Sequence, residues 1–194
     1  YQRSNQTYKM LMNICFFVLD GMLMTDESGA YKMATFSDEH MNRLFEKFVL
    51  EYYKVHHKGV SANTEHIEWD IDLEKSSMID FLPAMKTDIT LRKDNHVLII
   101  DTKYYGSTLQ YNFNRATIHS NNLYQVFSYV KNEDKCNTGE VEGMLLYAKT
   151  QEEISPDLDA VFGKNRIRVK TLDLNKEFID IAEQLDNIYK SSFE

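Results

Sequence analysis

Two aspartates and a lysine lie in or beside strand-like apolar runs in the stretch MKTDITLRKDNHVLIIDTKYY, residues 85–105. Such charges cost free energy beside buried strands unless an opposite charge compensates them. Carboxylates are preferred ligands of hard divalent cations. A lysine beside them can orient an attacking water, help to deprotonate it or neutralise charge on a phosphate. Asp88, Asp101 and Lys103 are therefore the first candidates for chemistry in this chain.

The spacing of this stretch predicts a β-hairpin. Residues 84–92 and 97–104 read as two strands, and the polar residues 93–96 suit a connecting turn because they include Asn and Asp. In this hairpin Arg92 faces Val97. Every other cross-strand pair follows from that one.

The same register places Asp88 opposite Asp101, with their Cβ atoms about 4.5–5.5 Å apart. Because side chains alternate along a strand, Lys103 lies on the same face as Asp101. The other face carries only apolar side chains and is predicted to face the core: Ile89, Leu91, Leu98 and Ile100. One side of the hairpin is thus apolar, and the other collects two carboxylates and an ammonium group.

Two facing carboxylates repel each other, and two explanations of their pairing stay open. The first is a bound divalent cation, Mg²⁺ with Mn²⁺ as a substitute, because such an ion takes a few carboxylate oxygens and keeps several waters. The second is an ordinary salt-bridge cluster, in which Lys103 and Lys86 or Arg92 neutralise the aspartates.

The remaining hydrophobic periodicity predicts an α/β protein with a mixed central sheet flanked by helices. The predicted elements are helices at 4–24, 38–56 and 121–130, strands at 66–73, 143–150 and 166–174, and a last helix capped by Asn175. Ser37 is the predicted N-cap of the second helix. We predict a division between residues 1–36, a helix and connection packed on or leading into the core, and residues 37–194, the main domain.

Composition bounds the class of protein. The chain has 194 residues and a formal net charge of −8, which argues against gripping nucleic acid by charge alone but not against a local basic groove. Its most apolar run, residues 14–24, is short and contains Asp20, so neither a membrane span nor a signal peptide is predicted. Cys15 and Cys136 lie far apart and are typical of free thiols, which favours a cytoplasmic protein.

Four segments, in this order, carry a family resemblance: LFEKFV (44–49), PAMKTDITL (83–91), LIIDTKYY (98–105) and NLYQVFSYV (122–130). Together they resemble the nuclease domain of the McrC family, the cleavage subunits of McrBC-type modification-dependent restriction systems, within the PD-(D/E)xK nuclease superfamily. The resemblance implies a restriction-endonuclease-like core with an extra N-terminal helix, and Mg²⁺-dependent hydrolysis of DNA phosphodiesters.

The resemblance also implies roles for matching residues. Asp88 and Asp101 would be metal-binding carboxylates, the backbone carbonyl of Thr102 a further ligand, and Lys103 the catalytic lysine. Glu46 matches an acid on the first core helix of the superfamily and would reach the metal through water. Its alternative is a solvated glutamate, because periodicity alone does not favour it over Glu51.

Gln125 and Tyr129 match the QxxxY pattern found in a subset of these nucleases. Their spacing puts both on one side of a helix. They would support the catalytic residues, and the alternative is that they merely edge the apolar core.

The polar segment 106–122 follows the catalytic strand directly and is predicted to be a long loop near the DNA. Arg115 and Asn114 would contact phosphates, and Tyr111 would approach the bases. The alternative is a loop that contacts nothing.

The resemblance implies DNA and a GTP-driven AAA+ partner of the McrB type, with two nuclease subunits pairing to cut both strands. Two other functions stay open. A non-catalytic adaptor would use the nuclease fold only to dock a motor ATPase or GTPase, and a RecB-like exonuclease would also fit the QxxxY pattern.

Overall fold

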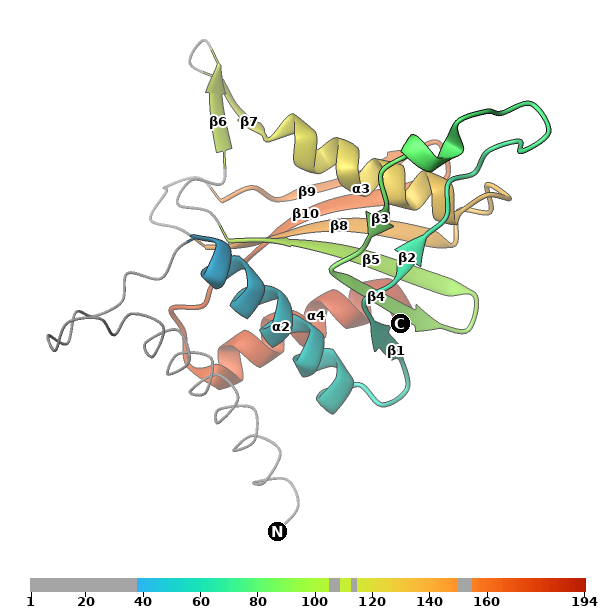
Figure 1. Ribbon diagram of the computed structural model, residues 1–194. Coiled ribbons are helices and arrows are strands. Elements are labelled where there is room, and N and C mark those ends of the chain that lie inside the picture. The colour runs from blue at the N-terminus through green and yellow to red at the C-terminus, as the bar shows by residue number, and fades with distance from the viewer. Residues whose placement is uncertain (1–37, 105–108, 113–114, 150–154) are drawn as a thin grey trace, which may run out of the picture.

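The computed structural model describes residues 38–104, 109–112, 115–149 and 155–194. In this part of the chain, helices cover both faces of a six-stranded sheet, which gives three layers (Figure 1). None of the helices described there is long and apolar enough to cross a membrane. The predicted helix at 4–24 and the predicted cap Ser37 lie outside the described residues.

The described helices are α2 (Asp38–His56), α3 (Ser120–Glu133) and α4 (Phe178–Phe193), with one 3₁₀ turn, η1 (Ile79–Phe81). The six strands of the main sheet are β1 (Ser61–Asn63), β4 (Ile89–Lys93), β5 (His96–Lys103), β8 (Val141–Ala148), β9 (Leu158–Phe162) and β10 (Asn165–Leu172). Two small antiparallel pairs stand beside it: β2 (His66–Ile67) with β3 (Met85–Lys86), and β6 (Leu109–Asn112) with β7 (Arg115–Ile118).

The main sheet is mixed, as the sequence predicts, and its strand order is β1-β4-β5-β8-β10-β9. Its central strands β5, β8 and β10 run parallel, while β1, β4 and β9 add antiparallel edges. Parallel neighbours cannot be joined by a tight turn, so the chain crosses from β5 to β8 through a segment that contains α3.

Two cores lie on the two faces of the sheet. On one face, α2 and α4 pack on the predicted apolar side of the hairpin, where Ile89, Leu91, Leu98 and Ile100 are all 0% exposed. On the other face, α3 packs so closely on β8 that a Cβ on Gly143 would come within 2.5 Å of Val126 Cγ1. Strand β5 is therefore buried on both sides, as expected for the centre of a parallel sheet.

The hairpin register is confirmed, because Arg92 pairs with Val97 and Ile89 pairs with Ile100. The predicted helix at 38–56 is also confirmed. The other predicted helices and strands that the structure confirms shift only at their ends, and the last helix begins at Phe178, with Glu177 rather than Asn175 at the N-cap position.

The predicted strand at 66–73 is wrong beyond Ile67, although its alternating pattern continues. The Ile71 amide bonds the carbonyl of Trp69, and the Asp72 side chain accepts the amide hydrogen of Glu74. These local turns replace cross-strand pairing, and Leu73 is left 67% exposed.

The predicted strand at 84–92 is divided. Its first part, β3, pairs with β2, and its second part, β4, begins only at Ile89. The chain bends at Thr87 and Asp88, where the Thr87 hydroxyl bonds Glu65 and the Asp88 side chain bonds strand β5.

The predicted loop at 106–122 contains structure that the sequence analysis missed. Strands β6 and β7 form a hairpin that projects away from the main sheet (Figure 1), and the last residues of the segment begin α3. The short edge strands β1 and β9 were also missed.

Candidate active site

The centre of the candidate site is the carboxyl end of β5. Asp101 lies there with 0% of its surface exposed, and the Nζ atom of Lys103 is 2.7 Å from its Oδ2 atom. The other carboxylate oxygen, Oδ1, is buried and has no hydrogen-bond partner among the described residues. A buried carboxylate with one unsatisfied oxygen is costly, and such atoms are found where an ion or a ligand is bound.

The side chain of Asp88 is hydrogen-bonded to Thr102, the residue that follows Asp101. Its Oδ2 atom accepts hydrogen bonds from the backbone N–H (2.7 Å) and the hydroxyl (2.9 Å) of Thr102. The hydroxyl of Thr64 donates to the backbone carbonyl of Asp88 at 2.9 Å. The two aspartates thus lie on adjacent segments, but Asp88 sits in a bend rather than in the strand that the sequence analysis placed it in.

Burial raises the pKa of Asp101 to about 7, although the positive charge of Lys103 lowers it. The negative charges of Asp88 and Glu46 raise it further. In the absence of a cation this carboxyl group is therefore partly protonated near neutral pH. Perturbed carboxyl groups of this kind gather at functional sites.

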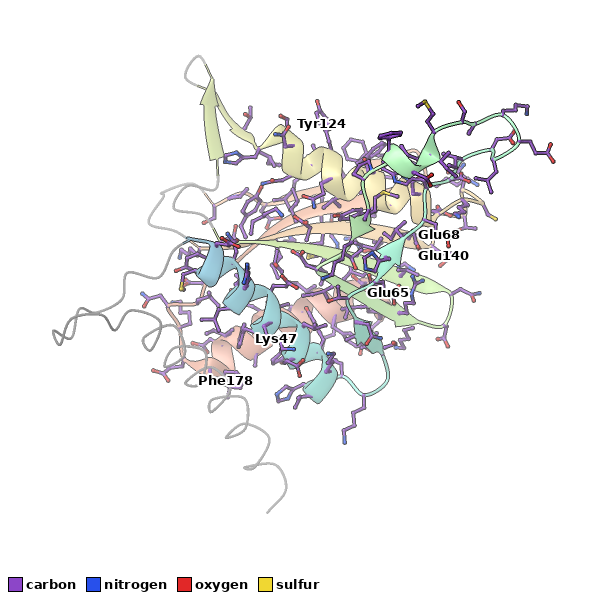
Figure 2. The ribbon with its side chains drawn as sticks, in the orientation of Figure 1. Lys47, Glu65, Glu68, Tyr124, Glu140 and Phe178 are labelled. Atoms are coloured by element: carbon purple, nitrogen blue, oxygen red, sulfur yellow. The ribbon has the colours of Figure 1, made fainter. Side chains whose placement is uncertain are left out.

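Glu46 belongs to the same electrostatic group, although it lies on α2. Burial raises its pKa, the charge of Asp88 adds to this effect, and Lys86 and Lys103 oppose it. Glu51, five residues further along α2, instead forms ion pairs at 3.2 Å with Lys54 and with Lys47, which projects from α2 (Figure 2). The structure therefore separates two glutamates that periodicity could not.

Gln125 and Tyr129 form a hydrogen-bonded chain from α3 to β3. The amide of Gln125 donates to the Tyr129 hydroxyl at 2.7 Å, and this hydroxyl donates to the backbone carbonyl of Lys86 at 2.9 Å. Burial raises the pKa of Tyr129, and the charges of Asp101 and Asp88 raise it further. Tyr129 is 6% exposed, so it is both a core residue and a neighbour of the carboxylates.

Arg92 does not neutralise the aspartates. Its guanidinium group binds Glu65, which Figure 2 labels, at 2.6 Å and Glu133 at 2.7 Å. Lys103, by contrast, does pair with Asp101. The salt-bridge alternative therefore holds for Lys103 and is wrong for Arg92.

Two of the three residues predicted to contact DNA lie in described strands, and no contact of theirs with DNA is tested. Tyr111 lies in β6 and Arg115 lies in β7, on the projecting hairpin, and Asn114 is outside the described residues. They follow strand β5 in sequence, and their contacts with DNA stay a prediction.

Two supporting residues were missed by the sequence analysis. The Oδ1 atom of Asn42 accepts the backbone N–H of Tyr104 at 2.6 Å, which ties α2 to the residue after Lys103. Thr64 holds the main chain of Asp88. Only Asn42 carried a signal, because it stands one helical turn before Glu46 and so shares its side of the helix.

The residues present fit a divalent cation in part. Among the described residues, no cluster of three or more His, Cys, Asp or Glu side chains is arranged to hold a metal ion. However, the unsatisfied oxygen of Asp101, with Asp88 bound to the next residue, gives two carboxylates of the kind that Mg²⁺ and Mn²⁺ prefer.

The fold and site together define an α/β protein in which a carboxylate and a lysine lie at the end of a central strand and a second carboxylate is hydrogen-bonded to that strand. Residues 1–148 match the family described as "McrBC 5-methylcytosine restriction system component", so the chain belongs to this family, and the predicted resemblance to McrC-type components is confirmed.

The chain is also 24% identical over 190 residues to the "Type IV methyl-directed restriction enzyme EcoKMcrBC" of Escherichia coli (strain K12). The match covers 97% of this chain and 52% of that protein, so the chain spans about half the length of its relative.

Proposed function

We propose that this chain is the DNA-cleaving part of a McrBC-type restriction system and hydrolyses DNA phosphodiesters with the help of Mg²⁺. The observation that carries the proposal is the buried Asp101 carboxylate. One of its oxygens has no hydrogen-bond partner among the described residues, and Lys103 pairs with the other. The side chain of Asp88 accepts a hydrogen bond from Thr102, the next residue of the strand. The family membership supports a place in a restriction system.

Asp88 and Asp101 would hold the metal, with the Thr102 carbonyl as a further ligand and Glu46 acting through a water. When bound, Mg²⁺ would supply positive charge that stabilises the negative charge developing on the phosphate. Burial has already removed Asp101 from water, so this carboxylate gains more from a cation than an exposed one would.

With a cation bound, the charge of Asp101 would be neutralised by the metal as well as by Lys103. Lys103 could then interact with the substrate. Its Nζ atom carries three donor hydrogens, and only one of them can point along the 2.7 Å contact to Asp101. In this proposal, the ammonium group of Lys103 would orient the attacking water or a phosphate oxygen when the substrate is bound. Donors fixed at such a position stabilise the transition state without reorganising.

The wider system follows from the relative and the family. The relative is described as methyl-directed and the family as a 5-methylcytosine system, which supports methylated DNA as the substrate. In this proposal a McrB-like AAA+ GTPase recognises the modification and translocates, and the present chain cuts. Two such chains would pair to cleave both strands, and the residues 111, 114 and 115 would contact the DNA.

One observation favours the adaptor alternative: within the described ranges, the acidic residues form no three-member metal cluster. In an adaptor, the Lys103–Asp101 pair would be structural only. The hydrogen bond between Gln125 and Tyr129 is equally compatible with a RecB-like exonuclease. A closed circular substrate separates the exonuclease, because an exonuclease needs a free end.

The direct test is cleavage of a closed circular, cytosine-methylated plasmid by the protein with its McrB-like partner, GTP and Mg²⁺. Lys103→Ala is expected to slow cleavage by about 100-fold, because a positioned charged donor is lost from the transition state. The control is Lys58→Ala, which removes an exposed lysine in the turn after α2. Unchanged cleavage by Lys103→Ala would show that the lysine is structural, as the adaptor alternative requires.

A further inference from the structure

The segment that leads into Asp88 presents a second lysine to the candidate site. From Met85 to Asp88 burial alternates: Met85 is 5% exposed and Thr87 is 1% exposed, whereas Lys86 is exposed and Asp88 is half-buried. The side chains of Met85 and Thr87 are thus buried, and the two side chains of this segment that stay accessible to solvent are those of Lys86 and Asp88.

The main chain of Lys86 is held in place from two directions. Strand β2 pairs with it, since His66 lies opposite Lys86, and the Tyr129 hydroxyl donates to its carbonyl at 2.9 Å. Gln125 in turn holds that hydroxyl at 2.7 Å. The main chain of Lys86 is thus held by neighbouring elements although its side chain is exposed, which lowers the entropy lost when the ammonium group binds a ligand.

The positive charge of Lys86 reaches the candidate site. It lowers the pKa of Glu46, against the effect of burial, and its influence on this pKa is larger than that of Lys103. The described residues nevertheless give its ammonium group no hydrogen bond or ion pair. The site collects three carboxylates, Glu46, Asp88 and Asp101, and the chain carries a net charge of −8. A DNA strand approaching it needs fixed cations close to the scissile bond.

We propose that Lys86 binds a phosphate of the DNA backbone beside the bond that is cut, and that the chain from Gln125 through Tyr129 positions it there. This inference rests on the proposed function and adds to it a phosphate-binding residue. Lys86 makes no bond to the reacting atoms. It fixes the strand so that the scissile phosphate lies against Asp88, Asp101 and Lys103.

The test measures DNA binding by fluorescence anisotropy, with a labelled duplex, the full chain, and Ca²⁺ in place of Mg²⁺ so that DNA is not cut. Lys86→Ala is expected to weaken binding by about 10-fold, because a charge-assisted contact to phosphate is lost. A plot of log affinity against log salt is expected to become less steep by about 1, since one fewer phosphate is neutralised. Lys86→Arg keeps the charge and is expected to retain the wild-type slope.

Lys58→Ala is the matched control, because it removes an exposed lysine from another part of the molecule. An unchanged slope in Lys86→Ala, equal loss in Lys58→Ala, or no DNA binding by the wild-type chain would each overturn the inference. The proposed function fails separately, if Lys103→Ala and Asp101→Asn cut DNA normally. A melting temperature equal to that of wild type excludes misfolding of the exposed-site variant.

Discussion

Asp101→Asn is expected to reduce cleavage of methylated plasmid DNA by about 1,000-fold or more. The substitution keeps the size of a side chain that is 0% exposed, so the fold is preserved. It removes the negative charge that would hold the metal and that pairs with Lys103 at 2.7 Å. The measurement is the rate of conversion of closed circular to linear plasmid, with partner, GTP and Mg²⁺ present.

The matched control for this variant is Asp94→Asn, on the same hairpin. Asp94 is exposed in the turn between β4 and β5 and has a positive φ of 52°, which asparagine also tolerates. It lies at the end of the hairpin away from Asp101, so its cleavage rate should equal that of wild type. Wild-type cleavage by Asp101→Asn, or equal loss in both variants, would contradict the assigned role.

The second large effect concerns stability in the absence of metal. The pKa of Asp101 rises from 3.8 in the unfolded chain to about 7 in the folded protein, chiefly through burial. A raised carboxyl pKa means that the folded state prefers the proton, so this contribution to stability is full below pH 4 and is lost as the pH rises to 7. The loss amounts to about 4 kcal/mol.

Asp101→Asn imitates the protonated carboxyl and does not titrate. Its free energy of unfolding, relative to wild type, is therefore expected to rise by about 4 kcal/mol between pH 4 and pH 8. Urea denaturation of both proteins with a chelator present measures the difference. Saturating Mn²⁺ should stabilise the wild-type protein and so reduce the difference in unfolding free energy between the two proteins. A difference that does not change with pH would contradict the burial of a strained carboxylate.

Asp88→Asn provides the internal comparison. The Asp88 carboxylate accepts the backbone N–H and the hydroxyl of Thr102, and hydrogen bonds to a charged acceptor are stronger than those to the amide that would replace it. Neutralising Asp88 should therefore give no comparable gain in stability. The two aspartates are equivalent when the hairpin is counted from the sequence. They are distinct in the structure, since Asp88 accepts two hydrogen bonds from Thr102, whereas Asp101 is fully buried and contacts Lys103.

The hairpin was predictable because its turn and its apolar face agree on one register. A slip of one residue would bury the charges on the α2 and α4 face, so Ile89, Leu91, Leu98 and Ile100 fix the pairing. The sequence did not reveal that the charged face is also buried. That burial depends on α3, a non-local element whose distance from β5 no local pattern encodes.

Failures of the sequence analysis have local causes as well. Residues 66–73 alternate like a strand, but after Ile67 no strand in the described part of the chain pairs with them, and Asp72 closes a turn through its own side chain. The hairpin of β6 and β7 was taken for a loop, because its polar composition resembles one and its strands pair only with each other.

The residues of the site were predictable from the sequence, but most of their contacts with one another are visible only in the structure. Spacing brought Asp88, Asp101 and Lys103 together, but only tertiary packing distinguishes Glu46 from Glu51 and brings Tyr129 to the carbonyl of Lys86. Lys86 itself was considered only as a partner for the aspartates. Its exposure and the fixing of its main chain depend on β2 and α3, which are distant in sequence.

The central claim is that Asp88 and Asp101 hold a divalent cation. The most direct test of this claim is an isothermal titration calorimetry experiment at pH 7.5, in which the metal-free chain is titrated with Mn²⁺. The account predicts one bound Mn²⁺ with a dissociation constant in the millimolar range or below, Mg²⁺ competition for it, and its loss in Asp101→Asn but not in Asp94→Asn. Absence of Mn²⁺ binding by wild type at millimolar concentration, or equal binding by Asp101→Asn, would contradict the claim.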